Sequence, residues 1–156
     1  MVFKKVIFSF FLFCSLNILV AQTNPLNIQQ FAHIPNSGFM VPSELNDIWG
    51  WVDSAGNEYA IVGMNDGTSI IDLSDPLNPQ EVLFVPGMNS IWRDIKTYGH
   101  YAYVTTDNPS TNGLLIIDLS NLPDSTNTNT YYYNGPSNSQ WGRAHNIFID
   151  DRGYAY

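Results

Sequence analysis

A five-residue string occurs twice in this chain and constrains its fold more than any other feature. Ile-Ile-Asp-Leu-Ser at residues 70–74 returns at residues 116–120, displaced by 46 positions. A second string, Tyr-Ala-Tyr, occurs at residues 101–103 and again at residues 154–156, where the sequence stops. Repeats of about 40–50 residues are typical of propellers and solenoids, in which each unit packs against its neighbours. We therefore expect the chain to be the front part of a longer repeat protein.

The apolar segments of each unit are short, rich in β-branched and aromatic residues, and separated by Gly, Pro, Asn and Asp, which is typical of β-strands. Residues 59–64 and 68–72 flank Asn65-Asp66-Gly67, and this order predicts a hairpin. The same hairpin with a longer loop is expected in the next unit, between residues 101–106 and 114–118. Further strand candidates precede or follow the hairpins, at residues 45–49, 92–96 and 144–148 and at residues 81–85 and 130–133.

Four short strands per unit is the pattern of a propeller blade. We therefore predict an all-β fold, a β-propeller of four-stranded blades of which about two and a half are present. A lead-in segment at residues 22–42 would precede blade 1 at about 43–88, blade 2 at about 89–140 and a truncated blade 3 from about 141. A β-sandwich also has many short strands, but it does not require one motif to recur in register.

The first 21 residues have the pattern of a secretory signal peptide. Lys4 and Lys5 form a positive region, the following residues are largely apolar, and Ala21 offers a small residue before the cleavage site. Ser15 and Asn17 interrupt the apolar run, which argues against the alternative of an uncleaved membrane anchor. We expect export to the cell envelope surface or the medium. We expect no membrane span in residues 22–156, and no anchoring segment is recognised there.

The charge of the mature chain limits its partners. Cleavage removes two of the six basic residues and none of the 14 acidic residues, which leaves a formal net charge of −10. A surface this acidic repels phosphate backbones, so nucleic acid is not an expected partner. The single cysteine, Cys14, lies in the signal segment, and the exported chain must therefore be stabilised by an apolar core without disulfides. No cofactor is expected.

Asp72 and Asp118 recur within the repeated string, each followed by Leu-Ser. We predict that their carboxylates accept hydrogen bonds from nearby backbone N–H groups and fix a turn, rather than taking part in catalysis. Asn65-Asp66-Gly67 and Asp107-Asn108 lack the spaced oxygen ligands of a calcium loop.

Two adjacent polar residues recur at one point of each first-strand candidate. They are Asn46-Asp47, Arg93-Asp94 and His145-Asn146, each followed by an isoleucine. In a propeller the first strand is innermost and lines the central channel, so equivalent side chains form a ring. Because side chains alternate along a strand, one residue of each pair should face the channel and the other a neighbouring blade.

This ring has two interpretations. As a ligand site, Arg93 would hold a carboxylate or phosphate, and His145 with Asp47 or Asp94 would bind a metal or move a proton. As a structural ring, Arg93 would pair with Asp94 or Asp47, since buried charges must be paired. No triad order, P-loop or zinc-protease motif is present, so no catalytic residue is assigned and the metal is left unknown. The candidate ligand-binding residues are Asp47, Arg93, Asp94, His145 and Asn146.

Several of these motifs together resemble the choice-of-anchor B family of secreted bacterial proteins, and residues 70–76 are similar to the LVIVD repeat found in that family. The resemblance implies a longer β-propeller at the cell surface, with varied C-terminal anchoring and no established enzymatic activity. We therefore expect a non-enzymatic binding or scaffold module for a protein or glycan partner. A hydrolase or lyase with its site at the channel mouth is the alternative. The motifs that carry the resemblance lie at residues 46–51, 58–60, 92–96 and 144–147.

Overall fold

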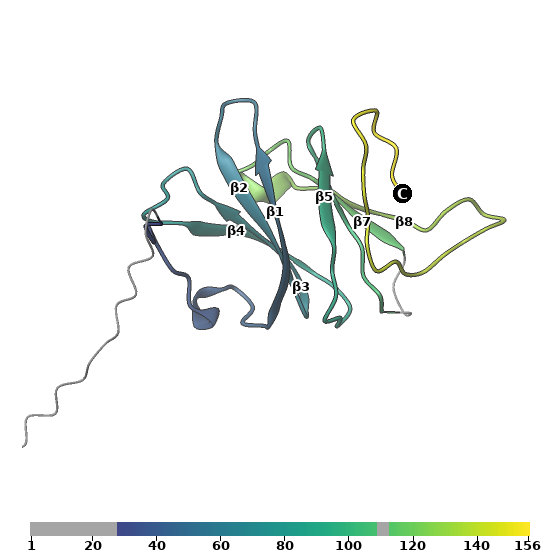
Figure 1. Ribbon diagram of the computed structural model, residues 1–156, viewed down its shortest axis with the longest axis horizontal. Coiled ribbons are helices and arrows are strands. Elements are labelled where there is room, and N and C mark those ends of the chain that lie inside the picture. Colours follow the sequence, from purple (N-terminus) through teal and green to yellow (C-terminus); the bar gives the residue numbers. More distant parts are fainter. Residues whose placement is uncertain (1–27, 109–112) are drawn as a thin grey trace, which may run out of the picture.

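The computed structural model describes residues 28–108 and 113–156, which form two four-stranded antiparallel sheets with almost no helix (Figure 1). The all-β prediction is confirmed; the expected signal peptide lies outside the described residues. The first sheet contains β1 (Leu45–Val52), β2 (Glu58–Met64), β3 (Gly67–Asp72) and β4 (Gln80–Pro86). The second contains β5 (Ile95–Tyr98), β6 (Tyr101–Val104), β7 (Leu114–Asp118) and β8 (Thr130–Tyr133). Two three-residue 3-10 turns complete the elements, η1 (Asn36–Gly38) and η2 (Ser125–Asn127).

Each sheet is a meander whose strands pair in chain order. The hairpin predicted around Asn65-Asp66-Gly67 is confirmed, because β2 and β3 pair from Tyr59 and Asp72 up to Met64 and Gly67. In the second unit β5 begins at Ile95, three residues later than expected.

The third unit differs from the strand predicted at residues 144–148. Its strand pairing in the described chain is an isolated bridge between Ile149 and Ala155. The residues before this bridge bond to the second unit instead. The N–H of Ala144 donates to the Thr106 carbonyl at 3.1 Å, and the N–H of Ile147 donates to the Asp94 carboxylate at 2.7 Å.

The main core lies between the two sheets, and a second, smaller core lies on the other face of the first sheet. Because successive side chains of a strand point to opposite faces, Tyr59 and Ile61 of β2 enter the main core while Val62 and Met64 enter the smaller one. Phe39 of the lead-in segment covers the smaller core. Burial on both faces explains why the apolar residues of β2 do not alternate with polar ones.

Asp72 and Asp118 have the predicted role in turns. The Asp72 Oδ1 atom accepts hydrogen bonds from the backbone N–H and the hydroxyl of Ser74, at 2.8 and 2.6 Å. The Asp118 Oδ1 atom accepts from the N–H of Ser120 at 3.0 Å. Hydrogen bonds from the hydroxyl and the N–H of Ser120 lower the pKa of Asp118. Both carboxylates therefore fix the chain where it leaves a strand.

Candidate functional site

The polar pairs singled out in the sequence come together at one end of adjacent strands. β1, β5 and the extended segment that leads to Ile149 lie side by side (Figure 1). A depression of about 440 Å³ opens where these three segments carry their polar pairs. All five candidate residues border it: Asp47, Arg93, Asp94, His145 and Asn146, together with Leu45, Asn46, Ile91 and Trp92.

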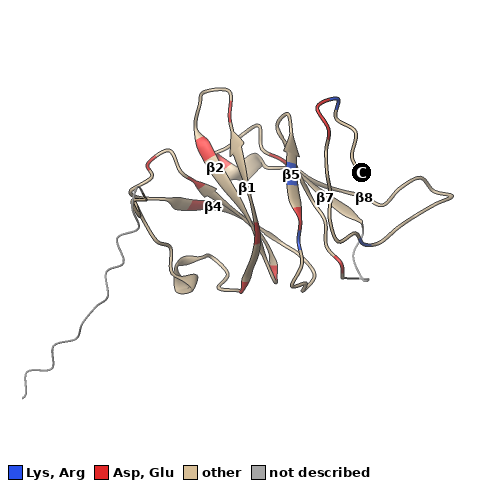
Figure 2. Ribbon diagram, viewed as in Figure 1, with Lys and Arg blue, Asp and Glu red and all other residues tan. Residues whose placement is uncertain are grey.

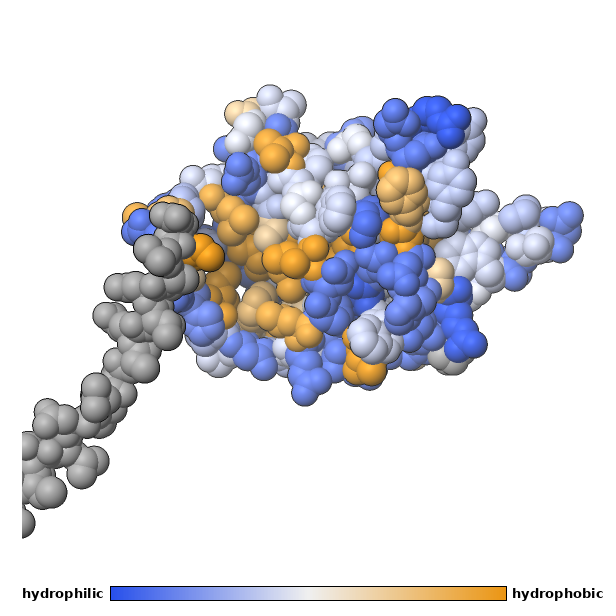
Figure 3. Space-filling view, in the orientation of Figure 1, coloured by the Kyte–Doolittle hydropathy of each residue, from blue (hydrophilic) through white to orange (hydrophobic). Residues whose placement is uncertain are grey.

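The surface around this depression changes character across the three segments. On the face drawn in Figure 3, hydrophobic side chains gather over β1 and hydrophilic ones over β5 and the segment beside it. Leu45 and Ile48 of β1 are more than half exposed.

A β-bulge presents both members of the first polar pair. Leu45 pairs with Met64 and Ile48 pairs with Val62, so Asn46 and Asp47 together oppose one residue of β2. Such a bulge changes the direction of the side chains it carries. The Asn46 Nδ2 atom donates to the Ser90 carbonyl at 3.3 Å, and Asp47 also bonds to the second unit. The prediction that one side chain of this pair faces the channel and the other a neighbouring blade is therefore wrong for Asn46-Asp47. Both side chains form hydrogen bonds to the second unit.

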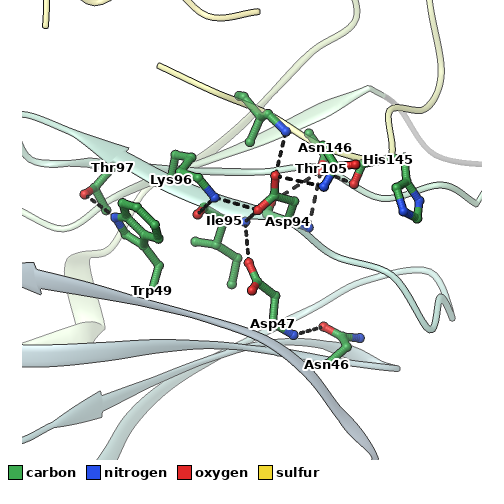
Figure 4. Close-up of polar contacts among 11 residues, drawn as sticks. Asn46, Asp47, Trp49, Asp94, Ile95, Lys96, Thr97, Thr105, His145 and Asn146 are labelled. Atoms are coloured by element: carbon green, nitrogen blue, oxygen red, sulfur yellow. Dashed lines mark hydrogen bonds and ion pairs between the residues drawn. The ribbon is translucent and has the colours of Figure 1, made fainter. Parts of the chain in front are cut away.

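One carboxylate in each of the first two units holds the start of the following unit. The Asp47 Oδ2 atom accepts from the N–H of Ile95 at 2.9 Å, and the Asp94 Oδ2 atom accepts from the N–H of Ile147 at 2.7 Å (Figure 4). Ile95 and Ile147 are buried next to these contacts, whereas Ile48, which has no preceding unit among the described residues, is 62% exposed. The repeated aspartate therefore joins successive units.

Two tryptophans of β1 strengthen the same junction. The Trp49 indole N–H donates to the Thr97 hydroxyl at 3.0 Å, and that of Trp51 donates to the Gly99 carbonyl at 2.9 Å. The Lys96 ammonium lies 4.3 Å from the centre of the Trp49 ring (Figure 4). β1 is thus attached along its length to β5 and the turn that follows it.

Asp94 is the most heavily engaged carboxylate at the depression. Its Oδ1 atom accepts from the Lys96 ammonium at 2.6 Å and from the N–H of Ile95 at 3.0 Å. Partial burial acts to raise the pKa of Asp94, but hydrogen bonds from Lys96 and from the Ile147 N–H outweigh burial and lower it. Asp94 is therefore held as a carboxylate whose bonds are internal to the protein.

Arg93 does not form the predicted ion pair with Asp94 or Asp47. Arg93 is 4% exposed; its Nε atom donates to the Met64 carbonyl at 2.7 Å, and Nη2 donates to the carbonyls of Asn65 and Met88. In the described part of the chain the ion pairs do not include Arg93, and Asp94 pairs with Lys96 instead. Burial lowers the pKa of the Arg93 guanidinium. The side chain thus reaches back to the first sheet, where it donates to backbone oxygens at the β2–β3 turn and after β4.

His145 also differs from its expected pairing with Asp47 or Asp94. Its Nδ1 atom lies 3.6 Å from the Asp107 carboxylate, and its ring points away from Asp94 (Figure 4). The Trp92 ring lies 5.4 Å away, centre to centre. Ser90 donates to the same Asp107 carboxylate at 2.7 Å, so the serine bonds the carboxylate rather than the imidazole, and this is not the order of a nucleophilic triad.

Sequence reasoning missed Asp107 and Ser90, which lie next to His145 at this site. Asp107 was interpreted only as a loop residue, and a contact across 38 positions to His145 has no local pattern that could indicate it. Within residues 28–108 and 113–156, no group of three or more His, Cys, Asp or Glu side chains is placed to hold a metal ion. The same residues include no helix with the length and apolar character needed to span a membrane.

Comparison with family models gives two matches to the LVIVD repeat, at residues 54–85 and 91–130. The first match covers β2, β3 and most of β4, and the second covers β5 to β7. Comparisons with curated proteins and with solved structures find no significant match.

Proposed function

We propose that this LVIVD-repeat protein is an exported β-propeller of the choice-of-anchor B family that binds a protein or glycan partner at the cell surface and catalyses no reaction. Two consecutive four-stranded meanders, joined through their first strands, support the propeller architecture. The motifs around Asp47, Arg93 and His145 support the family, and the signal-like residues 1–21 support export.

The exposed side chains of Trp92 and Ile91 at the edge of the depression are the main support for the binding proposal. Trp92 is half exposed, packs against His145 with its ring tilted, and lies beside Ile91, which is 57% exposed. Exposed aromatic side chains at the edge of a concave surface are typical anchors for a partner. A depression of about 440 Å³ also lies within the range of small-ligand pockets, about 300–1,000 Å³, which fits one or two sugar rings or an inserted side chain.

The carboxylates of the depression favour recognition over catalysis. Asp47 and Asp94 both accept backbone N–H groups of the next unit. A carboxylate committed in this way is poorly placed to move a proton on a substrate. All basic residues of the described chain lie in or next to β5 or in the segment that follows β8, while acidic residues occur along both sheets (Figure 2). This charge distribution argues against a polyanionic partner.

One observation keeps a hydrolase or lyase as a second candidate. The exposed His145 imidazole has the Asp107 carboxylate beside its Nδ1 atom, which is the arrangement that orients a general base. At 3.6 Å the contact is longer than a hydrogen bond in a preorganised site. Since Ser90 donates to Asp107 as well, the same carboxylate is shared with a structural contact.

A binding comparison of two aromatic variants tests the proposal. Full-length protein would be screened on a glycan array and in pull-downs from surface extracts, with Trp92→Ala as the test and Tyr131→Ala, an equally exposed aromatic of β8, as the matched control. We expect Trp92→Ala to weaken the partner about tenfold or more and Tyr131→Ala to bind as the parent does. Equal binding by both variants would contradict the proposal that the partner binds at Trp92.

A parallel activity screen separates the two candidate functions. Hydrolase and lyase substrates would be offered with and without EDTA, and any turnover would be repeated with His145→Ala. We expect no turnover. Turnover that disappears in His145→Ala would replace the binding proposal with the enzyme candidate.

A further inference from the structure

A second cavity lies between the two sheets, on the inner side of Arg93. Its volume is about 120 Å³, and its lining includes Thr68 of β3, Gly87, Arg93, Leu115 of β7 and Tyr132 of β8. Arg93 also borders the depression described above, but the other residues named here do not. The cavity therefore belongs to the junction between the sheets rather than to the surface site.

The Arg93 guanidinium brings a buried positive charge to this cavity. Its Nε and Nη2 atoms are occupied by the three backbone carbonyls, whereas Nη1 has no hydrogen-bond partner among the described residues. A Cβ atom at Gly87 would lie 3.1–3.3 Å from the guanidinium atoms, so the absence of a side chain there lets the backbone approach the charge. Carbonyl dipoles solvate the cation, and the Asp66 carboxylate acts on it electrostatically, but the ion pairs of the described residues do not include Arg93. A buried charge without a direct ion pair is costly in a protein interior.

The Thr68 hydroxyl provides a second donor without a partner. Thr68 is fully buried, and its Oγ1 atom has no hydrogen-bond partner. Buried hydroxyls in native structures are nearly always hydrogen-bonded, so an unpartnered hydroxyl next to a cavity indicates a site where a ligand or water binds. No carboxylate contributes to the lining.

We propose that this cavity binds one small monoanion, of the size of chloride, formate or acetate, between the Arg93 Nη1 group and the Thr68 hydroxyl. One water occupies about 30 Å³ of liquid, so the cavity holds a few heavy atoms and excludes phosphate esters and nucleotides. Water alone would satisfy the hydroxyl but would not neutralise the guanidinium. Burial lowers the pKa of Arg93 even though the charge of Asp66 acts in the opposite direction.

Such an anion would link the two sheets, because Thr68 belongs to the first sheet and Arg93 leads into the second. The stability of the junction would then depend on anion concentration. This inference is independent of the partner proposed above, since Trp92 and Ile91, which border the surface depression, do not line this cavity.

The test measures the melting temperature of full-length protein in sodium chloride, formate, acetate and gluconate at equal ionic strength, where gluconate serves as an anion too large for the cavity. We expect a saturable rise of several degrees with one or more of the small anions and none with gluconate, since a ligand of the folded state stabilises it by mass action. The anion that gives the largest rise at the lowest concentration distinguishes a halide site from a carboxylate site.

Variants and crystals complete the test. Thr68→Val keeps the shape of the side chain and should abolish the anion-dependent rise, whereas Thr130→Val, an exposed residue of β8, should retain it. A crystal soaked in bromide should show an anomalous peak within hydrogen-bond distance of Arg93 Nη1 and Thr68 Oγ1. The same melting temperature in all four salts, or a bromide-soaked crystal with only water in the cavity, would overturn the proposal.

Discussion

Asp94→Asn separates a structural from a ligand-binding use of the polar ring. Asparagine keeps the shape of aspartate but replaces one acceptor oxygen by an NH₂ donor. Both oxygens of Asp94 face donors, Oδ1 towards the Lys96 ammonium and the Ile95 N–H, and Oδ2 towards the Ile147 N–H. Either orientation of the asparagine amide therefore places a donor against a donor.

The expected loss follows from these contacts. A hydrogen bond to a charged group contributes about 1.5–3 kcal/mol, and an unsatisfied buried partner costs a further amount of similar size. The Lys96 and Asp94 side chains are 20% and 14% exposed, so solvent screens their attraction only in part. We expect Asp94→Asn to lower the free energy of unfolding by about 2–4 kcal/mol.

Asp47→Asn is the matched control for this prediction. The Asp47 Oδ2 atom accepts from the Ile95 N–H, and the carbonyl oxygen of an asparagine can accept that bond equally well. The third unit already carries Asn146 at this position. The control should therefore lose about 1 kcal/mol or less.

Denaturant unfolding of the full-length protein, followed by tryptophan fluorescence, gives both free energies by linear extrapolation. A double-mutant cycle with Lys96→Met isolates the contribution of the ion pair. Equal unfolding midpoints for Asp94→Asn and Asp47→Asn would refute this reasoning. An Asp94→Asn variant more stable than the parent would assign the carboxylate to a ligand instead.

Three further outcomes are expected. Gly63→Ala should destabilise the protein by about 1–3 kcal/mol, because its Cβ would fall 2.2 Å from the Asn46 Oδ1 atom, while Gly50→Ala, with open space around it, should not; thermal melts compare the two. Trp51→Phe should lose about 1 kcal/mol with its indole N–H bond to the Gly99 carbonyl in the turn after β5, measurable by denaturant unfolding. Since the folded-state pKa of Asp94 is lowered, its contribution is present above the unfolded value near 3.8 and is lost as the pH falls through the folded value. Stability measured from pH 6 to pH 2 should therefore fall less steeply for Asp94→Asn than for the parent.

The strand content could be predicted from the sequence because local patterns determine it. Short segments of β-branched and aromatic residues bounded by Gly, Pro, Asn and Asp predict the strands of both sheets, although β5 begins later than expected. The turn role of Asp72 follows from the chemistry of its neighbours. The interruption of pairing in the third unit was not predictable in this way. It arises because the N–H groups of Ala144 and Ile147 donate to acceptors in the second unit, and these are tertiary contacts that local patterns do not determine.

The partners of the candidate site residues could not be predicted for a related reason. The recurrence of polar pairs was enough to place Asp47, Arg93 and His145 around one depression. Their partners, however, are backbone groups or distant side chains. Every residue carries a carbonyl oxygen, so the sequence contains no sign that Met64 would accept from Arg93 in place of a carboxylate. The bulge at Asn46 is likewise a feature of pairing register, which periodicity alone does not specify.

The carboxylate bond between successive units has a direction. Asp47 on the first sheet accepts from the second unit, and Asp94 on the second sheet accepts from the third. Each interface therefore joins two unlike surfaces, so the units associate head to tail and not about a two-fold axis. A duplicated unit inherits both surfaces at once, the acceptor for its successor and the donor for its predecessor. Tandem duplication can therefore lengthen such an array with the same interface at every junction. A unit inserted in the reverse orientation would place acceptor against acceptor and donor against donor.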